Sequence, residues 1–378
     1  MELSRYLFQT CLLGATLLWL GRSWISHELG SKIGALYAVY WTSAVAFIYV
    51  WQGESQAIFY SSDQVDQFRS ILSIQRDGVE LTLDAFIGRR YLISIPASWL
   101  VDVGVEPLLA YKFLQGMSVL ALLAVATYWS RLQGLDLRPW HFLLVAGPSL
   151  LLNSVLALRD SVLAAAVATL LFGRSTLIRA IGLFVVFGLR PQLGVAIILG
   201  FFLAWLTPRL RRPVATALVA IGCYVLGGVV FDIANTFLVR SRDWTTLFLL
   251  SQAGIWRLLR SFVGLQFLSV NPDTVNLEFG TLLLLRLVFI DTWLAPLMFV
   301  VVVLLFSSSA RYSVSGRGTL YAFCVYIGIA SQTDFTSSRQ SLPFFAVFAL
   351  LALRDWKAEQ QLVSQGEHST RNIGWLRR

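Results

Sequence analysis

The chain has 378 residues, of which 57% are hydrophobic and only 13% are charged, and its mean hydropathy is +0.69. Because a soluble domain carries about a quarter charged residues, this composition predicts an integral membrane protein and excludes an ordinary soluble enzyme. The net charge of +9 comes largely from arginines in short breaks between apolar runs, which is typical of membrane topology and not of nucleic-acid binding. We therefore expect no nucleic-acid partner.

Apolar segments follow one another along most of the chain, at 6–20, 33–51, 105–129, 141–156, 161–173, 177–189, 193–206, 214–235, 281–305, 319–331 and 341–353. Several are shorter than the roughly 20 residues that a full membrane span needs. Between 141 and 206 the segments are separated by Arg159-Asp160, Gly173-Arg174 and Arg190-Pro191-Gln192, a pattern expected of short or broken helices that line a polar cavity.

These segments predict an all-α, polytopic membrane protein with about 11 transmembrane helices. Residues 1–355 form a single membrane domain, with external loops at about 52–104 and 236–280, and residues 356–378 form a cytoplasmic tail.

The breaks between segments fall into two alternating sets. One set holds mainly arginines, namely Arg131 and Arg138, Arg174 and Arg179, Arg209, Arg211 and Arg212, Arg311 and Arg317, and the tail from Arg354. The other set places arginine beside carboxylates or amides. The excess of basic residues in cytoplasmic loops predicts that the first set faces the cytoplasm and the second set faces outside. By the same alternation the N-terminus lies outside.

The first candidate cluster lies in the external loop 52–104. Asp63, Asp66 and Arg69 are spaced three apart, so two carboxylates and a cation share one face of a helical turn. External loops often carry functional residues, although an exposed helix in a loop would show the same spacing.

The breaks at Arg159-Asp160 and Arg190-Pro191-Gln192 are the strongest indication of a functional site in the sequence. Ionisable residues beside apolar helices are costly to bury, and in membrane segments they are functional by default. Arg190 and Gln192 offer a permanently charged planar fork and an amide, which suit pyrophosphate or carboxylate oxygens. The structural alternative for Arg190 is an interfacial side chain that extends to lipid headgroups.

Two further candidates come later in the chain. Asp334 and Arg339 precede the last segment, where a surface ion pair is the structural alternative. Arg257 lies beside Trp256 in the loop 236–280, and this mixture of cations and aromatic rings suits sugars and anionic headgroups. An amphipathic interfacial helix would look the same. Glu106-Pro107 fits a helix start, with proline in the first turn.

Some enzyme classes lack their usual motifs. The three histidines, His27, His141 and His368, are all expected on the cytoplasmic side, which disfavours membrane acyltransferases and O-antigen ligases. The chain contains no Walker A, GxSxG, HExxH or CxxC motif. Asp63 and Asp66 are too sparse a set to predict a bound metal, and we expect no cofactor.

Taken together, the motifs resemble one family. The chain has D-x-x-D at Asp63 and Asp66, N-S-x-x-x-x-R-D from Asn153 to Asp160, R-P at Arg190, and R-x-x-L-P-F from Arg339 to Phe344. With Glu106-Pro107, this series resembles the Wzy-type and EpsG-like bacterial polysaccharide polymerases, which are akin to GT-C glycosyltransferases.

The resemblance implies an enzyme that joins oligosaccharide units carried on undecaprenyl pyrophosphate at the outer face of the bacterial inner membrane. Its expected partners are the lipid-linked oligosaccharide, membrane lipids and, as a further candidate, a chain-length regulator. Arg159, Arg190 and Arg339 would stabilise the diphosphate, and Asp63 or Asp160 would accept a proton from the acceptor hydroxyl. Asp66, Arg69, Gln192, Arg257 and Asp334 are candidate substrate-binding residues.

A transporter or flippase of lipid-linked oligosaccharide is the alternative function. It would hold the pyrophosphate with the same arginines, and broken helices are also typical of transporters. Polar residues reachable alternately from both sides would favour the transporter, whereas access from outside alone would favour the polymerase.

Overall fold

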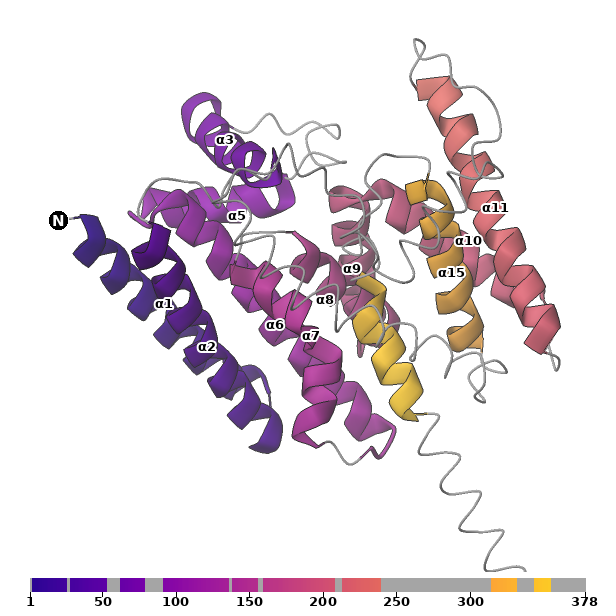
Figure 1. Ribbon diagram of the computed structural model, residues 1–378, viewed down its shortest axis with the longest axis horizontal. Coiled ribbons are helices and arrows are strands. Elements are labelled where there is room, and N and C mark those ends of the chain that lie inside the picture. The colour runs from indigo at the N-terminus through magenta and orange to yellow at the C-terminus, as the bar shows by residue number, and fades with distance from the viewer. Residues whose placement is uncertain are drawn as a thin grey trace, which may run out of the picture.

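The computed structural model describes residues 2–25, 28–52, 62–78, 91–135, 138–155, 159–207, 213–238, 314–331 and 343–354. These residues form helices and no strand, which confirms the predicted all-α class. The helices are α1 (Glu2–Trp24), α2 (Glu28–Gln52), α3 (Ser62–Asp77), α5 (Tyr91–Asp102), α6 (Pro107–Leu132), α7 (Pro139–Val155), α8 (Asp160–Phe172), α9 (Thr176–Leu189), α10 (Pro191–Leu206), α11 (Pro213–Leu238) and α15 (Val314–Ser331), with a further helix at Pro343–Arg354 (Figure 1).

Successive long helices run back and forth, so their ends gather at two opposite ends of the molecule (Figure 1). Arg5 Nη2 and Gln9 Nε2 both donate to the carbonyl of Gly104, at 3.1 and 2.7 Å, which joins the start of α1 to the start of α6. We call this end, where Arg190 also lies, the Arg190 end. We call the opposite end, where α6 ends at Arg131 and Leu132, the Arg131 end. There, Arg317 Nη2 of α15 donates to the carbonyl of Ala204 near the end of α10, at 3.2 Å.

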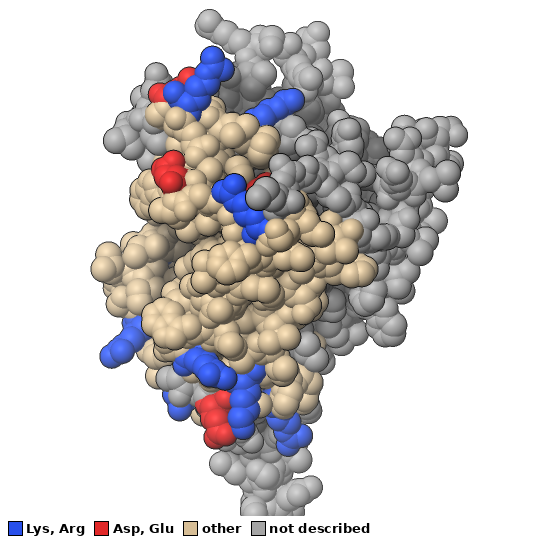
Figure 2. Space-filling model, turned by 90° about the vertical axis from the view of Figure 1, so that its left-hand side faces the viewer, with Lys and Arg blue, Asp and Glu red and all other residues tan. Residues whose placement is uncertain are grey.

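Charged and apolar side chains are separated on the face that Figure 2 shows. Lys, Arg, Asp and Glu gather toward the two ends, and a broad band of other residues lies between them. Several large apolar residues of α1 and α2 are exposed, among them Phe8, Trp19, Leu36 and Phe47. Exposed apolar surface of this extent is unusual on a soluble monomer and fits contact with lipid.

Two described helices are long and apolar enough to cross a membrane by length and composition, Glu28–Val50 and Pro107–Leu132. The shorter apolar helices are Asp160–Phe172, Thr176–Leu189, Pro191–Leu206, Leu218–Val230 and Pro343–Arg354. Within the described residues, each predicted segment from 6–20 to 214–235, and also 319–331 and 341–353, overlaps a helix, whereas 281–305 lies outside the described residues. The 11 crossings stay a prediction.

The region 52–104 contains more structure than the loop expected from the sequence. It holds α3 and α5, and α5 buries Ile93, Ser94, Ala97 and Ser98. α5 is only 12 residues long and contains Pro96, so it does not stand out in the sequence as a long apolar run. α5 packs against α3 and α6, and so this region forms part of the bundle.

Two apolar clusters share α6. One packs α1 and α2 against α6 through side chains such as Leu17, Trp41 and Phe113. The other packs α6, α8, α9, α10 and α15 together with the helix Pro343–Arg354. Gly200 permits close approach of α10 to α15, because a Cβ there would meet the backbone of Ala322. α15 is thereby held against α10, which carries Arg190 at its start.

The breaks predicted at Arg159-Asp160, Gly173-Arg174 and Arg190-Pro191-Gln192 are confirmed, and α7 has a further kink that was not predicted. α7 is kinked at Gly147, whose φ of 60° and ψ of 148° are not helical, and Pro148 follows directly. A positive φ favours glycine, and proline disfavours helical geometry in the residue before it. α8, α9 and α10 begin or end at the predicted breaks near Arg159, Gly173 and Arg190. The charged breaks are therefore true helix ends, with backbone groups available for side chains.

Candidate functional site

Arg190 lies at the turn between α9 and α10. It ends α9 and precedes Pro191, the first residue of α10, and its backbone is extended at φ −149° and ψ 85°. Pro191 forces this conformation, because the residue before a proline avoids helical geometry. The turn directs the Arg190 side chain away from both helix axes and into the bundle, where the residue is only 8% exposed.

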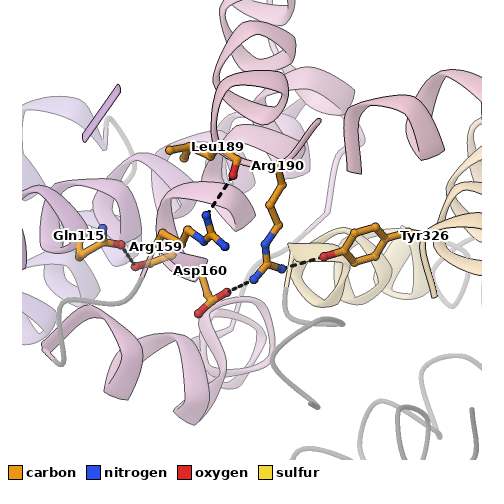
Figure 3. A network of polar contacts seen from close by, with 7 residues as sticks. Gln115, Arg159, Asp160, Leu189, Arg190 and Tyr326 are labelled. Atoms are coloured by element: carbon orange, nitrogen blue, oxygen red, sulfur yellow. Dashed lines mark hydrogen bonds and ion pairs between the residues drawn. The ribbon is translucent and has the colours of Figure 1, made fainter. Parts of the chain in front are cut away.

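Asp160, the first residue of α8, is the ionic partner of Arg190. Arg190 Nη2 lies 3.5 Å from Asp160 Oδ1, and Asp160 is fully buried (Figure 3). A carboxylate in the first turn of a helix is also favoured by the helix dipole. Burying two charges costs several kcal/mol per ion, roughly, which only good pairing offsets. The pair therefore links α8 to the α9–α10 turn.

Tyr326 of α15 completes the surroundings of Arg190. Arg190 Nη1 donates to the Tyr326 hydroxyl oxygen at 2.7 Å, and Tyr326 is buried. A hydrogen bond from a charged donor is stronger than a neutral one. This contact connects residues 136 positions apart in the chain and brings α15 into the site.

Arg159 adds a second guanidinium group. Its Nη1 donates to the carbonyl of Leu189, the last residue of α9, at 3.2 Å. The last carbonyls of a helix have no partner within the helix, and a cation there also interacts favourably with the helix dipole. Figure 3 shows the Arg190 guanidinium joined to the Asp160 carboxylate and the Arg159 guanidinium joined to the Leu189 carbonyl. Among the described residues, the site therefore holds two guanidinium groups and one carboxylate.

Gln115 of α6 lies to one side of these charged residues in Figure 3. Ser161 Oγ donates to Gln115 Oε1 at 2.6 Å, and both residues are fully buried. Gln115 follows the start of α6 by about 12 Å of helix rise, in a helix roughly 39 Å long. The start of α8 therefore lies well inside the bundle and not at its outer rim. Nearby in sequence, Asn153 of α7 is fully buried, with no hydrogen-bond partner for its amide among the described residues.

The structure brings together three of the residues predicted from sequence, Arg159, Asp160 and Arg190. Gln192 is on α10 but is exposed, and no described contact joins it to this group. Asp63, Asp66 and Arg69 are all on α3, as their spacing predicted, and Arg69 is exposed. The side chains of Asp63 and Asp66 lie outside what the structure describes, as do Arg257, Asp334 and Arg339 altogether.

Two residues of the site, Gln115 and Tyr326, were missed in the sequence. Each is one of several polar residues within an apolar helical segment, so the sequence does not single it out. The interpretation of Glu106-Pro107 as a helix start is confirmed. Glu106 is the N-cap of α6, its Oε2 accepts from the amide of Leu109 at 2.6 Å, and Pro107 occupies the first turn.

The arginines of the opposite set are mostly exposed. Arg131, Arg138, Arg174 and Arg179 are all exposed at the Arg131 end. Arg317 differs, since it is buried and donates to Ala204. Among the described residues, no group of three or more His, Cys, Asp or Glu side chains could hold a metal ion.

Chemically, two fixed guanidinium groups with one carboxylate can bind an anion and hold or accept a proton. Guanidinium forks match the paired oxygens of phosphate groups. No family model, no curated protein and no solved structure matches this chain.

Proposed function

We propose that this protein is a glycosyltransferase of the bacterial inner membrane that joins oligosaccharide units carried on undecaprenyl pyrophosphate. It crosses the membrane several times, with the Arg190 end outside, and has a GT-C-like fold. The observation that carries the proposal is the cluster of Arg159, Asp160 and Arg190 where three short helices begin or end, in which Asp160 and Arg190 are buried and Arg159 is partly buried.

The leaving group explains why two arginines are needed. When the glycosidic carbon is attacked by an acceptor hydroxyl, its bond to the diphosphate oxygen breaks and negative charge develops on the diphosphate. Donors fixed before the reaction stabilise such charge without reorganising. Arg190 is held by Asp160 and Tyr326, and Arg159 by the Leu189 carbonyl, so both guanidinium groups are fixed in advance.

The acceptor hydroxyl must lose its proton in the same reaction. Asp160 is the carboxylate of the cluster and can accept that proton when the diphosphate draws Arg190 toward itself. Asp63 is the second candidate for this role. No metal or cofactor enters the proposed reaction.

The two ends of the molecule support the orientation. Exposed arginines gather at the Arg131 end, as expected for a cytoplasmic face. The cluster of Arg159, Asp160 and Arg190 belongs to the opposite end, where a lipid-linked oligosaccharide would arrive after crossing the membrane.

The test is complementation of a deletion of the gene in its native host, with the surface polysaccharide separated on a gel. Wild type and the control Arg174→Gln should restore a ladder of repeat units. Arg159→Ala and Arg190→Gln, present in the membrane at the wild-type level, should leave a single unit. A full ladder from both variants would overturn the proposal.

The depth of the site supports a transporter as the second candidate function. Gln115, which marks the level of the cluster, lies about a third of the way along α6. A transferase needs its site to be reached from outside alone, so this depth is not required for it. If the protein is a transporter, the deletion strain should accumulate lipid-linked units that face the cytoplasm. A transferase would leave them facing outward. The leaflet in which they accumulate therefore separates the two functions.

A further inference from the structure

A cavity lies at the Arg190 end, between α1, the end of α2 and the start of α6. It has a volume of about 370 Å³ and is lined in part by Arg5, Tyr6, Gln9, Tyr49, Gly104 and Glu106. Its volume lies within the range of about 300–1,000 Å³ typical of small-molecule pockets. None of these residues belongs to the cluster around Arg190.

Aromatic rings form one part of the lining. Tyr6 and Tyr49 stack with their ring centroids 3.6 Å apart and their planes at 10°. Tyr6 is buried, whereas Tyr49 is partly exposed. The stack holds the Tyr49 ring in one orientation, so that it offers a fixed apolar surface beside polar groups.

Hydrogen bonds fix the polar part. Gln9 Nε2 donates to the carbonyl of Gly104, and Gln9 Oε1 accepts from the amide of Glu106 at 3.2 Å. Arg5 donates to the same carbonyl, and Glu106 accepts from the amide of Leu109. A guanidinium group has five donors and a carboxylate about four acceptor positions. Both groups therefore keep the capacity to bind a ligand after these contacts are made.

The charges of the lining select the class of ligand. Arg5 and Glu106 oppose each other in charge, so the cavity favours neither an anion nor a cation. A fixed ring, an amide, a carboxylate and a guanidinium group together suit a neutral molecule with apolar C–H faces and many hydroxyl groups. Sugars have this combination.

Its position suits a ligand that arrives from water. Glu106 directly precedes the candidate span Pro107–Leu132, so the cavity lies at the rim of the bundle. Gln115, which contacts Ser161 beside Asp160, lies about 14 Å further along the same helix. A chain of a few sugars bound at the rim could extend inward to the Arg190 cluster.

We propose that this cavity is a saccharide-binding site that holds a sugar of the acceptor chain. The saccharide specificity follows from the cavity alone, and only the acceptor role rests on the proposed function. Glu106 and Gln9 bind hydroxyl groups, and the Tyr49 ring packs against the C–H face of the sugar.

The test uses the purified full chain in detergent, carrying a fluorescent label, on an array of immobilised neutral, acidic and amino-sugar oligosaccharides without lipid or phosphate. Wild type should bind a subset of neutral oligosaccharides. Glu106→Gln, which keeps an oxygen for the α6 N-cap, and Tyr49→Leu should each weaken this binding at least about tenfold. The control Arg174→Gln, at an exposed residue of the opposite end, should bind as wild type does.

Several outcomes would overturn the proposal. One is a folded wild type that binds none of the oligosaccharides, and another is a wild type that prefers acidic ones. The third such outcome is binding by Glu106→Gln and Tyr49→Leu that is as strong as that of wild type. The gel experiment above is independent of this result, because Arg190→Gln leaves the cavity intact. Binding on the array together with a full ladder from both Arg159→Ala and Arg190→Gln would overturn the proposed function and retain the saccharide site.

Discussion

The exposed arginines of the Arg131 end contrast with the buried Arg190 of the opposite end. At the Arg131 end, Arg131, Arg138 and Arg174 are exposed. At the Arg190 end, Arg190 is buried against a carboxylate and a tyrosine hydroxyl. An exposed arginine contributes little to stability because water and salt screen its charge. A buried one must be paired, and its surroundings are therefore specific.

The contrast also shows why helix length matters. α8, α9 and α10 have 13, 14 and 16 residues, whereas α6 has 26. Short helices leave their polar ends inside the bundle, level with the middle turns of longer neighbours. Charged side chains at those ends are consequently shielded from water, and electrostatic interactions gain strength there.

Replacement of Asp160 should produce the largest effect. Asp160→Ala removes the carboxylate and leaves Arg190 with a buried, uncompensated charge, which should cost about 3–5 kcal/mol of unfolding free energy. Arg174→Ala, at the exposed end, should change it by less than about 0.5 kcal/mol. Chemical unfolding in detergent, followed by tryptophan fluorescence, measures both.

A double-mutant cycle sharpens this comparison. Asp160→Ala combined with Arg190→Ala should cost less than the sum of the two single variants, by about 0.5–3 kcal/mol. Strict additivity would contradict a direct Asp160–Arg190 interaction.

Loss of the Tyr326 hydroxyl should have an intermediate effect. Tyr326→Phe removes the acceptor of a hydrogen bond from a charged group, which should cost about 1.5–3 kcal/mol. Tyr40→Phe, at a residue 39% exposed, is the control and should be nearly neutral. Equal unfolding midpoints for Tyr326→Phe and wild type would show that α15 is not tied to Arg190.

A smaller effect is expected at the Arg131 end. Arg179 Nε donates to the carbonyl of Gly173, at the end of α8, at 2.9 Å. Arg179→Ala should cost only about 0.5–1 kcal/mol, as is usual for a cation near a helix C-terminus. A loss as large as that of Asp160→Ala would break the distinction between the two ends.

Glu106 should give the smallest effect, visible as a pH dependence. Burial raises the pKa of the Glu106 carboxyl, against the amides of Leu109 and Leu108 and the charge of Lys112, which lower it. Because the pKa is raised in the folded state, that state binds the proton more tightly than the unfolded chain does. The resulting stability is present below the ordinary pKa of glutamic acid and is lost as pH rises through the raised value.

The melting temperature of wild type should therefore rise relative to that of Glu106→Gln as the pH falls from 7 toward 5. Thermal unfolding of both proteins across this range measures the difference. A constant difference, or one of opposite sign, would contradict the raised pKa.

The sequence by itself determined the helices and their breaks. Apolar runs end where Arg159, Gly173 and Pro191 interrupt them, because local chemistry decides where a helix stops. It also separated the two sets of arginines, since alternate breaks in an antiparallel bundle fall at alternate ends. The helix α5 was not predicted, because Pro96 divides a short apolar run in the sequence, although one face of α5 is buried in the bundle.

Only the tertiary structure decided which polar groups meet. Asp160 pairs with Arg190 of another helix turn, and Tyr326 reaches Arg190 across 136 residues. Gln115 meets Ser161 through the packing of α6 on α8. A helical pattern specifies which residues share a face of one helix, but it leaves open the depth and rotation at which helices pack. Those are set by close contacts such as Gly200 against Ala322, and they alone bring distant charges together.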